Sequence, residues 1–109
     1  MNEETATAAE LYGELAPGLV AFTDEVLFGQ VWSRSELSRR DRSLVTVAAL
    51  VAGGNVEQLR FHLPYAIGNG LGEAELIEVI THLAFYAGWP KAMSALAVAK
   101  ELFTTSQEV

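Results

Sequence analysis

Apolar residues recur along this chain at intervals of three and four positions, which is the period of an amphipathic α-helix. No stretch alternates strictly between polar and apolar residues, as a half-buried strand does. The β-branched run at residues 44–47 is ambiguous by itself, but it lies inside a longer helical period. The pattern therefore predicts an all-α protein.

Proline, glycine and capping residues between these apolar stripes divide the pattern into about six helices. Pro17 suits the first position of a helix. Ser38, with Asp41 three residues later, has the spacing of a reciprocal cap, and Asn55 is expected to cap the next helix. The predicted helices cover about residues 5–15, 17–29, 38–53, 55–68 and 73–87, with a last one through Ala92 and Phe103.

Two further features shape the predicted helix at 55–68. Pro64 removes one backbone hydrogen bond, so it should either kink this helix or end a first segment. The sequence Gly68-Asn-Gly70 should then close the helix in a left-handed turn.

Composition narrows the range of functions. The length of 109 residues, half of them apolar, predicts one domain over 1–109 with a modest core. The formal charge of −7, with seven Lys and Arg, argues against a nucleic-acid partner, because phosphate contacts need clustered basic residues. Zero cysteines exclude disulfides, thiolate catalysis and thiolate zinc sites.

Nothing in the sequence predicts a targeting or membrane segment. The first ten residues are acidic and lack the basic start and apolar run of a signal peptide. The longest strongly apolar stretch, 44–52, is far shorter than the ~20 residues that span a bilayer. We expect a cytoplasmic protein with no membrane partner.

His62 is the first candidate for chemistry. On the predicted helix it lies beside Leu59 and Leu63, at the border of the buried face. Partial burial there would lower its pKa and keep it neutral as a base near pH 7. The alternative is a structural histidine whose ring nitrogen bonds a backbone carbonyl.

His82 is the second candidate. Glu78 lies four residues before it, a spacing that can place two metal ligands on one helix face. Two ligands without a third are a weak signal, and an ion pair or surface contact explains the spacing as well. We therefore predict no metal site.

Three segments of the chain together carry a family resemblance: residues 37–50, residues 55–62 and the block Thr81-His-Leu-Ala-Phe-Tyr-Ala-Gly-Trp-Pro90. The chain resembles the carboxymuconolactone decarboxylase family, most strongly over residues 22–103. The resemblance implies an all-α fold and a homo-oligomer, a trimer or hexamer with pockets between subunits.

The alkyl hydroperoxidase branch of this family uses a Cys-x-x-Cys pair, an upstream glutamate and the histidine that matches His62. The cysteine positions hold Asn55 and Gln58 here, and the glutamate position holds Ser43. Thiol peroxidase activity by that route is therefore excluded on chemical grounds.

The residues that remain are similar to those of the decarboxylase branch, which implies cofactor-independent loss of CO2 from a lactone acid. An example is the conversion of 4-carboxymuconolactone to 3-oxoadipate enol-lactone in aromatic-compound catabolism. The resemblance implies that His62 delivers the proton and that Glu57, or a carboxylate of a neighbouring chain, orients it. A family member with another small-molecule substrate, or with a non-catalytic binding role, is the alternative.

The same resemblance implies roles in substrate binding. Arg42, with Arg39 or Arg34, is expected to orient carboxylates, although the arginines at 39–42 equally fit a solvated helix start. His82 and Tyr86 are expected at a subunit contact or pocket wall. Trp32, beside the arginines, either lines a pocket or fills the core.

Overall fold

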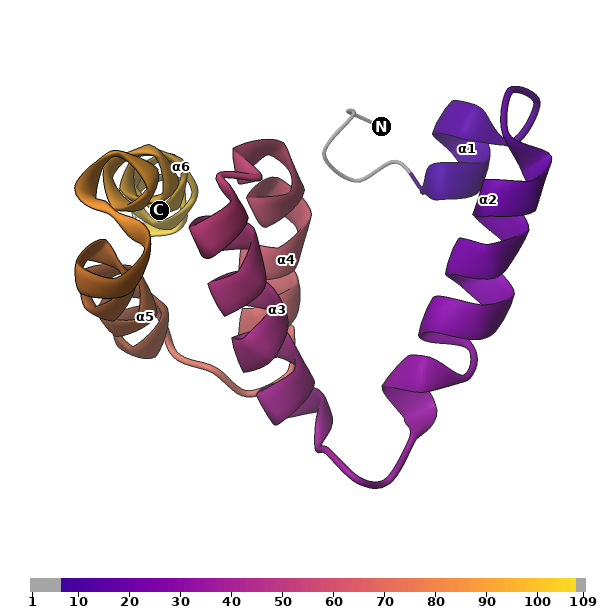
Figure 1. Cartoon of the computed structure of the whole chain (residues 1–109), viewed down its shortest axis with the longest axis horizontal. Coiled ribbons are helices and arrows are strands. Elements are labelled where there is room, and N and C mark those ends of the chain that lie inside the picture. The colour runs from indigo at the N-terminus through magenta and orange to yellow at the C-terminus, as the bar shows by residue number, and fades with distance from the viewer. Residues whose placement is uncertain (1–6, 108–109) are drawn as a thin grey trace. The chain divides into compact units, whose positions relative to one another are not determined.

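A computed structural model describes residues 7–107, and within this range every regular element is helical. The elements are α1 (Ala8–Tyr12), α2 (Pro17–Ala21), the π-helix η1 (Phe22–Phe28), the 3₁₀-helix η2 (Val31–Ser33), α3 (Arg39–Gly53), α4 (Val56–Gly68), α5 (Glu73–Ala87) and α6 (Trp89–Gln107). Figure 1 shows them in chain order. The all-α prediction is confirmed.

The chain divides into two compact units, with the boundary between Arg39 and Arg40. We call residues up to 39 the first unit and residues 40–109 the second unit, and each is described by itself. The prediction of one domain over 1–109 stays a prediction. No helix in the described part of the chain is long and apolar enough to cross a membrane.

The first unit begins with a short capped helix. Thr7 Oγ1 accepts a hydrogen bond from the Glu10 N–H at 3.1 Å, and Glu10 Oε2 accepts one from the Thr7 N–H at 3.2 Å. The predicted start at residue 5 lies outside the described residues, and α1 ends at Tyr12 rather than at residue 15. Ala16, which precedes Pro17, has the non-helical angles φ −136° and ψ 65°. Steric contact with the proline ring disfavours helix at that position, and Pro17 opens α2 as predicted.

The helix predicted over 17–29 is present but changes its hydrogen bonding along the way. After α2, residues 22–28 continue as a π-helix, which the apolar pattern did not predict. Leu15, Leu19 and Phe22 are 83%, 68% and 67% exposed. The first unit therefore presents large apolar side chains to solvent.

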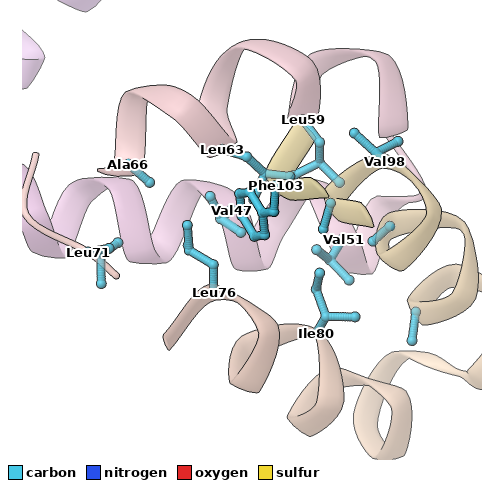
Figure 2. Close-up of a cluster of buried hydrophobic side chains, with 13 residues drawn as sticks. Val47, Val51, Leu59, Leu63, Ala66, Leu71, Leu76, Ile80, Val98 and Phe103 are labelled. Atoms are coloured by element: carbon cyan, nitrogen blue, oxygen red, sulfur yellow. The ribbon is translucent and has the colours of Figure 1, made fainter. Parts of the chain in front are cut away.

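The second unit is built around one core between its four helices. Figure 2 shows side chains from α3, α4, α5 and α6 converging there. Its fully buried members include Val47 of α3, Leu63 of α4 and Leu76 of α5, and Phe103 of α6 is 8% exposed. The core consists of Val47, Val51, Leu59, Leu63, Ala66, Leu71, Leu76, Ile80, Ala92, Ala95, Val98, Ala99 and Phe103.

The structure narrows one prediction about α4 and corrects another. The helix runs through Pro64 without a break, so Pro64 does not end a first segment, and a kink at Pro64 stays a prediction. Asn55 occupies the N-cap position, but its side chain makes no capping hydrogen bond. Its angles, φ −90° and ψ 66°, are not the extended ones of a side-chain cap, and its Oδ1 lies where a Cβ on Gly53 would clash with it.

The turn from α4 to α5 follows the prediction. Gly70 has φ +109°, a conformation that glycine adopts without a Cβ penalty. The Leu71 N–H donates to the Ala66 carbonyl at 3.0 Å and brings Leu71 into the core. The next helix, α5, has the predicted bounds of 73–87.

Candidate functional site

His62 lies on the middle of α4 and is half-buried. Its imidazole ring meets Phe61 edge-on with centroids 4.9 Å apart, and Tyr65 edge-on at 6.1 Å. Burial lowers the pKa of His62 below its ordinary value of 6.5, because water is removed from around the charged form. The site thus holds an imidazole that favours its neutral form near pH 7.

One face of α4 carries His62 together with Tyr65 and Asn69, and we call these three residues the His62 stripe. Spacings of three and four residues place them in a row, since His62 and Asn69 differ by only about 20° around the helix. Asn69 Nδ2 donates a hydrogen bond to Ser43 Oγ on α3 at 2.9 Å, and Ser43 is fully buried. This bond holds the end of the stripe against α3.

Arg42 precedes Ser43 on α3. Its side chain is half-buried and its Nε atom is buried. A guanidinium at a solvated helix start would not be enclosed in this way, so that alternative does not describe Arg42. Arg39 is exposed and fits it better. Arg42 is the sequence neighbour of Ser43, the α3 residue that bonds Asn69 of the His62 stripe.

Glu57 lies on another side of α4. Its side chain is 74% exposed and its Oε2 pairs with Arg60 Nε at 3.6 Å. Arg60 also donates to Glu101 of α6 at 2.9 Å. Five residues along a helix correspond to about 140° of rotation, so Glu57 points away from His62 on the same helix. The structure does not bring these two predicted catalytic residues together.

His82 and Tyr86 lie on α5, with ring centroids 4.8 Å apart. Both side chains are exposed, Tyr86 at 78%. His82 lines a groove of about 440 Å³ between α3 and α5. The groove has an apolar floor and a charged rim, and its lining residues are Arg40, Leu44, Ala48, Leu71, Glu75, Glu78, Val79, His82 and Leu83.

The charges on the rim of this groove largely satisfy one another. Arg40 bonds Glu75 at 2.5 Å and Asp41 at 3.4 Å. The Gly72 N–H and, to a lesser degree, Arg40 hold the pKa of the Glu75 carboxyl below its usual range. With Glu78 also on the rim, acids outnumber arginines, so the groove is a poor site for a carboxylate substrate.

Trp32 belongs to the first unit, where it is 5% exposed and stacks on Phe28 with ring centroids 5.8 Å apart. This burial fits the packing interpretation of Trp32, and its role in substrate binding stays a prediction. As for a metal, no group of three or more His, Asp or Glu side chains among the described residues is placed to hold one.

The structure shows several side-chain interactions near the candidate sites that the sequence did not predict. Arg40 was treated as part of a solvated helix start, yet it pairs with a glutamate 35 residues away. The Ser43–Asn69 bond spans 26 residues and has no local signal. Tyr65 had a signal, because its position three residues after His62 places both on one helix face.

The comparisons with known proteins agree on one family. A model of the carboxymuconolactone decarboxylase family matches residues 17–101. The chain is 44% identical over 82 residues to a 4-carboxymuconolactone decarboxylase of Acinetobacter baylyi, covering 75% of this chain and 61% of that protein. It is 35% identical over 85 residues to a nitrosuccinic acid decarboxylase of Metarhizium robertsii, covering 78% and 59%. The chain thus spans about three fifths of the length of these two relatives.

Proposed function

Since this chain belongs to the carboxymuconolactone decarboxylase family, we propose that it removes CO2 from a small carboxylated lactone or a related acid. The proposed reaction uses no cofactor, and His62 is its proton-transfer group. The observation that carries the proposal is the half-buried His62, whose pKa is lowered by burial. Such a group can exchange a proton near neutral pH, as general acid–base catalysis requires.

The proposed step takes up one proton for each molecule of CO2 released. The bond between carbon and the carboxylate breaks, its electron pair moves through the conjugated system onto an acceptor oxygen, and CO2 leaves. The carbon that carries the negative charge then takes one proton. His62 is neutral before substrate binds, and an anion within about 4–6 Å favours its protonated form, so binding primes it as the acid.

Arg42 is the proposed partner for the substrate carboxylate. Its guanidinium can hold a carboxylate through two parallel hydrogen bonds. The partly buried position of Arg42 supports this role, because its interaction with an anion is less weakened by water than that of an exposed arginine. Arg39, which is exposed, is the weaker candidate.

The names of the two relatives suggest one substrate class. 4-Carboxymuconolactone passes the electrons of its departing carboxylate to a lactone carbonyl, and nitrosuccinic acid passes them to a nitro group. In both compounds the carbanion is delocalised onto oxygen. The proposed substrates of this chain are therefore small acids that have an acceptor of this kind, with the lactone acid first among them.

We expect the purified chain to release CO2 from 4-carboxymuconolactone faster than buffer alone. The measurement is CO2 release followed against time, with nitrosuccinic acid as the second compound and the same solutions without protein as controls. Turnover of either compound supports decarboxylation and tells which acceptor is preferred. Release at the spontaneous rate from both compounds would contradict the proposed activity and favour a binding role.

We also propose that the chain assembles into a homo-oligomer, a trimer or hexamer. Phe85, Tyr86 and Trp89 are 75%, 78% and 57% exposed, and Phe85 meets Trp89 edge-on at 5.3 Å. Exposed aromatic groups of this kind are typical of association surfaces. Light scattering should give a mass of several chains, and Phe85→Ser should lower it. A monomer at all concentrations would contradict this proposal.

A place in aromatic-compound catabolism and in the cytoplasm is likewise proposed. The first rests on the name of the Acinetobacter relative, which acts on 4-carboxymuconolactone. The second rests on the resemblance to the family. Neighbouring genes for aromatic-acid breakdown would support the catabolic role.

A further inference from the structure

Tyr65 differs from the other two tyrosines in its surroundings. Tyr12 and Tyr86 are 52% and 78% exposed, whereas Tyr65 is half-buried. Its ring stacks on Phe61 with centroids 5.1 Å apart and planes inclined by 28°. Its edge-on contact with His62 at 6.1 Å fixes the ring from a second side. The phenol is therefore held in a defined place relative to the imidazole.

The proposed reaction needs two different donors. One must give a proton to carbon, and the other must stabilise the negative charge that moves onto the acceptor oxygen. His62 serves the first purpose, and Arg42 is assigned to the carboxylate. Within the His62 stripe, Asn69 already donates to Ser43, which leaves its orientation set by that bond. Tyr65 is the hydroxyl of the stripe, and a phenol can donate a hydrogen bond to an oxyanion.

We propose that the Tyr65 hydroxyl is a further catalytic group, which donates a hydrogen bond to the substrate oxygen that becomes negative as CO2 leaves. This inference rests on the proposed decarboxylase function. The phenol transfers no proton, since its ordinary pKa of about 10 keeps it protonated at neutral pH. The proton on carbon still comes from His62, so the balance of the step is unchanged.

The first test is the kinetics of Tyr65→Phe, which removes the hydroxyl and keeps the ring contacts. We expect kcat to fall by about 10²–10³-fold, the usual effect of removing one oxyanion donor, with KM changed little. Tyr12→Phe, which removes an exposed hydroxyl in α1, is the matched control and should retain wild-type kcat. A Tyr65→Phe enzyme with wild-type kcat would overturn the inference and leave the decarboxylase function standing.

The second test does not require turnover. The freshly prepared nitronate of 3-nitropropanoate carries negative charge on oxygen, as the proposed carbanion does, and serves as the probe. Calorimetry should show at least about tenfold weaker binding of the nitronate by Tyr65→Phe, because a hydrogen bond to a charged group is lost. Binding of butanoate, which has one carboxylate and no second group with charge on oxygen, should change less than about twofold by the same reasoning.

If the role of Tyr65 were merely structural, Tyr65→Phe would weaken the binding of both ligands equally. That result would overturn the inference, as would equal nitronate binding by wild type and variant, or no nitronate binding by wild type. Absence of CO2 release by wild type, with selective nitronate binding intact, would instead contradict the proposed decarboxylase activity. The two failures are therefore distinguishable.

Discussion

His62→Gln is expected to lower kcat/KM for decarboxylation by about 10²–10⁴-fold, the range for loss of a general acid. Glutamine has a similar size and can still form hydrogen bonds, but it cannot carry a proton between solvent and substrate. The substitution removes the titrating group and also the ring contacts of His62 with Phe61 and Tyr65. Steady-state kinetics from pH 5 to 8 provide the measurement.

The control for His62→Gln is Ile67→Ala, on the same helix but on a different face. Ile67 is 39% exposed, and we expect the kcat/KM of the Ile67→Ala variant to stay within about twofold of the wild-type value. An unchanged kcat/KM in His62→Gln would show that another group supplies the proton. His62 would then be the structural histidine of the alternative interpretation.

The pH dependence of stability gives a second observation on the same variant. Burial lowers the folded-state pKa of His62 below 6.5, so at least one pH unit above 6.5 the residue is mostly neutral in both the folded and unfolded states. As the pH falls below that value, the unfolded chain binds a proton more readily than the folded chain, and the free energy of unfolding decreases. Urea unfolding at pH 7.5 and 5.5 should therefore show a larger loss for wild type than for His62→Gln. An equal loss in the two proteins would contradict the lowered pKa.

Leu63→Ala is expected to reduce the free energy of unfolding by about 3–5 kcal/mol, the upper part of the range for a buried leucine. Leu63 is fully buried in the core that α3, α4, α5 and α6 share, so the substitution leaves a cavity as well as removing apolar contact. Typical domains are stable by only about 5–15 kcal/mol, so the variant should be marginal at 25 °C. Urea denaturation followed by circular dichroism measures the change.

Ile67→Ala is again the comparison, because Ile67 lies one turn further along α4 and is partly exposed. Ile67→Ala should reduce the free energy of unfolding by about 1 kcal/mol, since this substitution returns less buried apolar surface to water than Leu63→Ala does. Similar losses for Leu63→Ala and Ile67→Ala would show that the inward face of α4 has been assigned incorrectly. A larger loss for Leu63→Ala supports the core shown in Figure 2.

Much of the fold was predictable because its signals are local. The bounds of α5, 73–87, follow from a regular apolar period, acids in the first turn and Gly88 after the last turn. The π-helix at 22–28 was not predictable in this way, since its apolar pattern also suits an α-helix. Asn55 shows the limit at a helix start, because residue type favours a cap while the observed backbone angles direct its side chain elsewhere.

The candidate site was only partly predictable. His62 was identified from its spacing, its position beside apolar residues and the family resemblance. The predicted partner Glu57 is paired with Arg60 instead, because five helical positions turn it away from His62. Arg40 and Glu75 are 35 positions apart, and which acid an arginine meets across such a distance depends on how the helices pack.

The sequence by itself determined the helical class, most helix bounds, the family and the absence of thiol chemistry. These follow from short-range spacing and from which residues are present, and neither depends on how distant segments meet. Only the tertiary structure decided that Ser43 and Asn69 join α3 to α4 and that Arg42 is partly enclosed. The tertiary structure also decided the direction of the pKa shift of His62. That shift comes from desolvation, which depends on the side chains packed around the ring and not on the residue type alone.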